Sequence, residues 1–222
     1  LEKAKFEISQ IINQLKGDRI GIIVFAGSSH LYLPLTSDYE ATQLFLDAID
    51  TKMIPNQGTD LSTALRTGIS VFNKEDDKYK VMVLVTDGED HEGAAIELAS
   101  TALKSGIITH SVGVGTDKGS LIPIKNDPNN NRYKRDKKGI LITSKLNENM
   151  LIEIANAGGG IYSRFNNRDS KYKEIISAID NMEKRSIETH IYSEYEDRYQ
   201  SFATISFLLL TAGLIMPTRK KI

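Results

Sequence analysis

A run of five apolar residues that ends in a polar turn constrains the fold of this chain more than any other feature. Residues 81–85 read VMVLV, and Thr86, Asp87 and Gly88 follow at once. Continuous apolar runs rich in valine are typical of parallel strands buried on both faces of a sheet. Ligands of open α/β sheets bind at the carboxyl ends of the strands, so we expect Asp87 at a binding edge. The alternative is that Asp87 and Asp90 only cap the following helix.

The rest of the chain alternates between short strand-like runs and segments with helical spacing of apolar residues. The first helical pattern ends at Gly17, and Ser37 with Glu40 has the spacing of a capping box that begins another helix. Further strands are expected at 19–25, 30–35, 107–114 and 161–164, and further helices at 61–72, 95–102, 148–155 and 172–179. This alternation predicts a doubly wound, mostly parallel, Rossmann-like α/β sheet over residues 1–185, with 30–35 as one antiparallel edge strand.

Composition excludes several functional classes. The chain has 28 Lys and Arg against 29 Asp and Glu, and a net charge of −1 does not indicate a nucleic-acid surface. It has no cysteine, which excludes disulfides, zinc–thiolate sites and thiol catalysis.

Residues 116–139 are polar and rich in Asn, Lys and Asp, so we expect a long surface excursion there, with a hairpin near its end.

The C-terminal segment differs in kind from the rest. Residues 202–216 carry no charge, and Arg219, Lys220 and Lys221 follow. We expect a transmembrane helix at 201–217, preceded by a juxtamembrane linker at 186–200 and followed by a basic cytoplasmic tail at 218–222. By the positive-inside rule the α/β domain would then lie outside the cytoplasm, on the periplasmic side of the inner membrane, in a single-pass protein. A buried core helix is the alternative.

A hydroxyl and a carboxylate are expected at the same edge of the sheet. Thr59 lies in the polar loop PNQGTD just before a helix, and Asp87 follows the VMVLV strand. Hard oxygen ligands of this kind suit Mg²⁺, or alternatively Mn²⁺ or Ca²⁺. Two ligands are too few, so further oxygens would come from another loop or from the carboxylate of a partner.

Several motifs in this order resemble a known family. The segments GDRIG, PLTSDY, QGTD and TDGE are similar to those of von Willebrand factor type A domains, and most similar to the membrane-anchored bacterial proteins of the aerotolerance-associated Bat type. The resemblance implies a metal-ion-dependent adhesion site (MIDAS) built from an Asp-x-Ser-x-Ser loop, a threonine and an aspartate. Thr59 matches the threonine and Asp87 the aspartate.

The Asp-x-Ser-x-Ser loop of the family is absent from this chain, which begins with Leu1 inside a helical pattern. In the family this loop follows the central first strand, so the resemblance implies that this strand is missing as well. Its loss would leave a slot of about 10 Å between the strands at 19–25 and 81–85, because neighbouring strands lie about 4.8 Å apart. We therefore expect an N-terminally truncated domain with an incomplete metal site, and a chain that is a piece of a longer protein.

The resemblance implies a membrane-anchored domain that binds proteins in a cell-envelope complex linked to oxygen tolerance. A divalent cation would be completed by an acidic residue of the partner, and a MoxR-type ATPase system is an implied associate. Two alternatives stay open: a Mg²⁺-dependent hydrolase or phosphotransferase that uses the Asp87 loop, and a metal-free interaction domain. A nucleotide site at Gly113, Gly115 and Gly119 is disfavoured, because the spacing is G-x-G-x-x-x-G and no helix is expected next.

Overall fold

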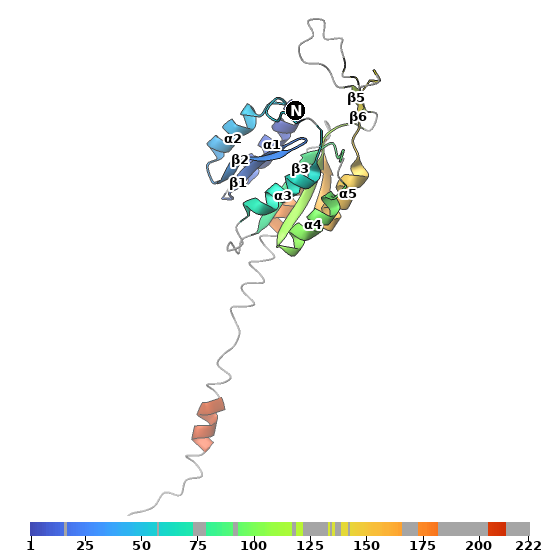
Figure 1. The fold of residues 1–222 in the computed structure, drawn as a ribbon. Helices are drawn as coiled ribbons and strands as arrows, with labels where there is room; N and C mark the ends of the chain where they lie inside the picture. Colours follow the sequence, from blue (N-terminus) through green and yellow to red (C-terminus); the bar gives the residue numbers. More distant parts are fainter. Residues whose placement is uncertain are drawn as a thin grey trace, which may run out of the picture. The chain divides into compact units, whose positions relative to one another are not determined.

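The computed structural model describes residues 1–15, 17–56, 58–72, 79–90, 93–116, 119–121, 133, 135, 139–141, 143–165, 173–181 and 204–211. The chain divides into two units, Leu1–Asn181 and Met182–Ile222. The first unit holds every labelled helix and strand in Figure 1. It is an α/β domain with a parallel sheet at its centre, as the alternation of strands and helices predicts.

Three parallel strands form the sheet that carries Asp87. Their order is β3 (Lys80–Thr86), β4 (Ile107–Gly113) and β7 (Gly159–Arg164), and both pairings are parallel. The register aligns Thr86 of β3 with Gly113 of β4. The carboxyl ends of these neighbouring strands therefore lie at one edge, and Asp87 begins the loop that leaves that edge.

The remaining labelled strands form two small antiparallel pairs. β1 (Ile20–Phe25) pairs with β2 (Ser29–Thr36), which confirms the predicted antiparallel strand. β5 (Ser120–Leu121) pairs with β6 (Thr143–Ser144) across the excursion, and a single antiparallel bridge joins Arg135 to Leu141. The bridge agrees with the hairpin expected near residue 139, whereas no pattern in the sequence predicts the β5–β6 pair.

Among the described strands, β1 has no partner besides β2, and β3 has none besides β4. Burial follows this division. Every residue of β1 and all but one of β3 are half-buried, whereas all but one residue of β4, which has a strand on each side, are buried. The two open edges agree with the slot expected between these strands.

Alternate side chains of β3 enter two separate cores, as a doubly wound sheet requires. Met82 and Leu84 belong to a cluster under α3 (Leu61–Val71), α4 (Ala95–Lys104) and α5 (Glu148–Ala157), which lie side by side in Figure 1. Val83 and Val85 pack in the other cluster, with Ile11 of α1 (Glu2–Gln14) and Ile175 of a helix over residues 173–181. Helices therefore cover both faces of the parallel sheet.

Helix α3 packs against both β1 and β3. A β-carbon on Gly68 would lie 2.3 Å from the sulfur of Met82 and 3.7 Å from Cδ1 of Ile23, so the helix lies against both strands at this point. Phe25 of β1 packs against the same cluster as Met82 and Leu84 of β3. One helix therefore links the two sheets although their strands do not pair.

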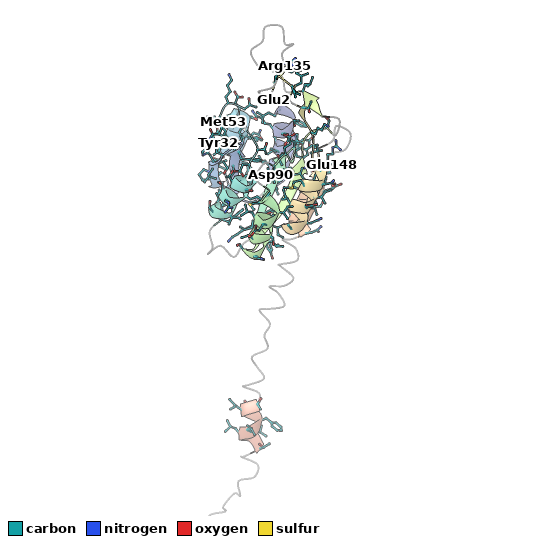
Figure 2. All side chains as sticks on the ribbon, turned by 45° about the vertical axis from the view of Figure 1, so that its right-hand side comes forward. Glu2, Tyr32, Met53, Asp90, Arg135 and Glu148 are labelled. Carbon is teal, nitrogen blue, oxygen red and sulfur yellow. The ribbon has the colours of Figure 1, made fainter. Side chains whose placement is uncertain are left out.

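Helix α2 (Tyr39–Ala48) begins one residue later than the capping box predicts. Its N-cap is Asp38, whose carboxylate accepts the N–H of Ala41 at 2.9 Å. Asp and Ser are about equally favoured at the N-cap position. The capping-box spacing therefore predicted Ser37, whereas its neighbour Asp38 is the N-cap. The ring of Phe45 on this helix meets that of Tyr32 on β2 edge to face, and Tyr32 is labelled in Figure 2.

The predicted transmembrane helix at 201–217 is wrong. The described part of this segment is a helix over residues 204–211 alone, and eight residues rise about 12 Å against a hydrocarbon core of about 30 Å. The last described residue of this helix, Thr211, donates its hydroxyl to the carbonyl of Phe207 at 3.0 Å. Within the described ranges no helix is long and apolar enough to cross a membrane. The predicted linker at 186–200 and tail at 218–222 lie outside the described residues.

Candidate metal site at the carboxyl edge of β3

Asp87 is held at the end of β3 by contacts on three sides. Its carbonyl accepts the N–H of Asn147 at 2.8 Å, and its Oδ2 accepts the hydroxyl of Ser144 at 2.7 Å. Among the described residues, its Oδ1 has only long contacts, to the N–H of Glu89 at 3.3 Å and to the hydroxyl of Thr86 at 3.4 Å. The side chain is half-buried. One carboxylate oxygen is thus firmly held, and the other keeps most of its capacity for a ligand.

Asp87 does not cap a helix. The next helix, α4, has Ala94 as its N-cap and no side-chain cap. Asp90 accepts the N–H of Gly93 at 3.0 Å, which closes a turn before that helix. Asp90 is labelled in Figure 2. The capping role that was the alternative for Asp87 is therefore excluded, and its carboxylate lies in a loop at the carboxyl edge of the sheet.

Gly88 allows the Asp87 loop to approach α5 closely. Its φ is +77°, and a β-carbon there would lie 2.6 Å from the carbonyl oxygen of Asn147 and 2.9 Å from Cγ of Leu151. Contacts this short do not occur with a real side chain, so glycine is required for both the backbone angle and the space. The sequence signal TDG therefore has a defined cause in this fold.

Thr59 lies in the loop that packs on the end of β1. The N–H of Gly27 donates to the carbonyl of Asn56 at 3.0 Å, and the N–H of Asp60 donates to the carbonyl of Ala26 at 2.9 Å. Asp60 caps α3 by accepting the N–H of Thr63 at 3.0 Å. Thr59 is half-buried, and within the described residues its hydroxyl makes no hydrogen bond.

The structure places the loops of Thr59 and Asp87 over one buried cluster but does not join the two side chains. Leu61, two residues after Thr59, and Leu84, three before Asp87, are members of that cluster. No hydrogen bond between Thr59 and Asp87 occurs in the part of the chain that the structure describes. The expected pair thus shares one region of the domain without direct contact.

Residues 144–147 make most of the hydrogen bonds to the Asp87 loop from elsewhere in the chain. The sequence carries no functional signal in this segment. Besides the bonds of Ser144 and Asn147, the N–H of Lys145 donates to Oε1 of Glu89 at 3.2 Å. Asn147 also caps α5, as the sequence predicts, by accepting the N–H of Met150 at 3.3 Å. Ser144 carries no recognisable signal, because 57 residues of chain separate it from Asp87.

One ion pair lies beside this segment, in the first turn of α5. Glu148 accepts a bond from Arg164 at the end of β7 at 2.7 Å, and Glu148 is labelled in Figure 2. Arg164 also reaches the carbonyl of Gly115 at 3.5 Å. Both side chains are about a third exposed, so the pair contributes little stability and serves mainly to fix the loops at this edge.

The two histidines that the structure describes have no metal-ligand role. His110 is 2% exposed, and its Nδ1 accepts the N–H of Ile161 at 3.0 Å, so the proton of the neutral ring is on Nε2. Burial lowers the pKa of His110 to about 4. This confirms the prediction of a core histidine. His30 is exposed and lies near the hydroxyl of Ser28, while His91 and His190 lie outside the described residues.

The donors present fit a hard divalent cation in chemistry but not in number. The Asp87 carboxylate, with one lightly engaged oxygen, and the Thr59 hydroxyl are oxygen ligands of the type that Mg²⁺ selects, but that ion takes six ligands. Within the described ranges no three His, Cys, Asp or Glu side chains gather in one place. Ser9, the early serine of α1, gives its hydroxyl to Gln43 at 2.8 Å and offers no substitute for the missing loop.

The von Willebrand factor type A domain model matches residues 1–149, and the chain belongs to this family. Within it, the chain is similar to the solved structure of the conserved hypothetical protein BatB from Bacteroides thetaiotaomicron, at 40% identity and a TM-score of 0.78, covering 82% of this chain and 88% of that one. An aerotolerance-related membrane protein from Bacteroides fragilis is 39% identical, with a TM-score of 0.76, covering 81% and 88%. The resemblance to Bat-type proteins is therefore confirmed.

Two other proteins are more distantly similar. An uncharacterized protein of Borreliella burgdorferi is 25% identical over 97% of this chain, and the chain spans 61% of that relative's length. Proximal thread matrix protein 1 of the mussel byssus, solved with a zinc-occupied MIDAS motif, has a TM-score of 0.58 at 15% identity, covering 79% of this chain and 39% of that one. At this identity the mussel protein shows the shared fold alone.

Proposed function

We propose that this domain binds a protein partner through a divalent cation held at Asp87 and Thr59. The observation that carries the proposal is the state of the Asp87 carboxylate, which lies at the carboxyl edge of β3 and caps no helix. Among the described residues, its Oδ1 has contacts of only 3.3 and 3.4 Å. Mg²⁺ is the first candidate, with Mn²⁺ and Ca²⁺ as alternatives, because all three select oxygen ligands.

An acidic residue of the partner would complete the coordination. Asp87 and Thr59 supply one carboxylate and one hydroxyl, and no three His, Cys, Asp or Glu side chains gather among the described residues, so the remaining positions are left to water and to the partner. The contact that a coordinated carboxylate makes with the cation is directional, and it is lost when a chelator removes the cation. Binding of this kind is reversible and breaks no covalent bond. Bound metal would supply that ionic link, while Asp87 and Thr59 orient it.

We propose interaction rather than catalysis for the Asp87 loop. The second carboxylate of this loop, Glu89, accepts the N–H of Lys145 at 3.2 Å and so holds the loop to the segment 144–147. His110 is enclosed in the core and is no base for a substrate. A Mg²⁺-dependent hydrolase or phosphotransferase therefore finds less support than a binding module, and a metal-free interaction domain is the outcome if chelation has no effect.

The similarity to BatB and to an aerotolerance-related membrane protein supports a role in a cell-envelope complex linked to oxygen tolerance. A MoxR-type ATPase system is the proposed associate. The test is partner capture from envelope extracts by the full-length protein in Mg²⁺ and in EDTA. Capture should be lost in EDTA and in Asp87→Asn, and kept in Asp90→Asn, which changes a carboxylate of the same loop. Equal capture by Asp87→Asn and the unmodified protein would reject the proposal.

A further inference from the structure

We infer that Ser144 is a positioning residue for the cation site, an inference that rests on the proposed function of Asp87. Its hydroxyl donates to Oδ2 of Asp87 at 2.7 Å, the shortest contact of that carboxylate among the described residues. A hydroxyl has a single proton to donate, and here it is committed to Asp87. Ser144 therefore acts on a metal through the aspartate, by fixing which oxygen faces the loop and which is left for coordination.

The backbone holds Ser144 in place from both sides. Ser144 pairs with Ser120 in the β5–β6 ribbon, and the N–H of Leu146 donates to the carbonyl of Thr116 at 3.3 Å. Two more hydrogen bonds hold the segment: the N–H of Lys145 donates to Oε1 of Glu89, and the N–H of Asn147 donates to the carbonyl of Asp87. Residues on either side of Ser144 are thus anchored independently of its side chain, so loss of the hydroxyl alone should leave the segment where it is.

The consequence for metal binding comes from the geometry of the carboxylate. A carboxylate that rotates freely must be ordered when a cation binds, whereas one held by a donor on one oxygen is ordered in advance. Hydrogen bonds that orient metal ligands in this way typically change metal affinity by 10–100-fold. Ser144, which follows the polar excursion, would thereby set the affinity of a site 57 residues earlier in the chain.

The experiment is a Mn²⁺ titration, followed by electron paramagnetic resonance, on the full-length protein and four variants. Ser144→Ala should bind Mn²⁺ about tenfold more weakly, and Ser144→Thr, which keeps the hydroxyl, should bind like the unmodified protein. Thr143→Ala is the matched control, because Thr143 is the exposed neighbour in β6 and makes no hydrogen bond to Asp87 within the described residues. Asp87→Asn reports on the site itself. If Ser144→Ala proves unfolded by circular dichroism, Ser144→Cys replaces it, since a thiol fills the space but donates weakly.

The outcomes separate the inference from the function on which it rests. Weaker binding by folded Ser144→Ala, with affinity kept by Ser144→Thr and Thr143→Ala, supports it. Loss of binding in Asp87→Asn together with unchanged binding in Ser144→Ala overturns the inference and leaves the metal site standing. No Mn²⁺ binding by the unmodified protein, or equal binding by Asp87→Asn, overturns both.

Discussion

A β-carbon on Gly88 would lie 2.6 Å from the carbonyl oxygen of Asn147, and this close approach docks the Asp87 loop onto the first turn of α5. The same contact brings the N–H of Asn147 to the carbonyl of Asp87. The position of the candidate ligand thus depends on a glycine beside it and on a helix that begins far along the chain, at Glu148.

Gly88→Ala should destabilise the domain by about 2 kcal/mol or more, because it adds a clash with backbone to a left-handed φ. Gly93→Ala is the control: its φ of +73° is nearly the same as the +77° of Gly88, but a β-carbon there meets nothing within 4 Å. The difference between the two variants in urea unfolding isolates the contact with Asn147. Equal losses would show that the loop does not pack against α5 as described.

Stability should fall in acid because of His110. Its pKa is lowered from 6.5 to about 4 by burial, so the folded state binds a proton less readily than the unfolded state. The loss is absent above about pH 6.5, grows as the pH falls, and reaches about 2–3 kcal/mol near pH 4.5. The measurement is urea unfolding at pH 7 and at pH 4.5.

His110→Asn serves as the comparison, since an amide oxygen can accept the N–H of Ile161 in place of Nδ1 but does not titrate in this range. Between the two pH values this variant should lose about 2–3 kcal/mol less stability than the unmodified protein. A change at the exposed His30 should leave the acid loss as it is. Identical acid losses with and without His110 would contradict the assignment.

Amide exchange should distinguish β3 from β4. Because β4 has a strand on each side from Thr109 to Gly113, its amides should be protected along that stretch, whereas in β3 only alternate amides face β4. The others face the edge at which the described strands provide no partner, and they should exchange faster with a period of two residues. Uniform protection along β3, measured by NMR on the 222-residue chain, would show that this edge is paired.

Much of the fold was accessible from the sequence because periodicity reports burial directly. The continuous apolar run at 81–85 predicted a strand buried on both faces, and its alternate residues do enter two cores. The N-cap of α2 was misplaced by one residue because Ser37 and Asp38 compete for the same role. The membrane helix was predicted from the absence of charge over residues 202–216, but within the described ranges no helix is long and apolar enough to cross a membrane.

The candidate site was only half accessible. Asp87 and Thr59 stand out because each follows turn chemistry near the end of a strand or the start of a helix. Ser144 could not be found, because nothing local distinguishes it from the polar residues around it, and its role depends on a long-range contact made by folding. The hydrogen bond between Glu89 and the N–H of Lys145 likewise could be found only from the tertiary structure.

The cation site that we propose joins Thr59 and Asp87, and its most direct test is a Mg²⁺ titration of the full-length protein followed by NMR of backbone amides. We predict that amides at Thr59 and Asp60 and those at Asp87 to Glu89 shift together along one saturating curve. Asp87→Asn should remove the shifts in both loops. Shifts confined to one loop, or no saturable change in either, would contradict a shared site.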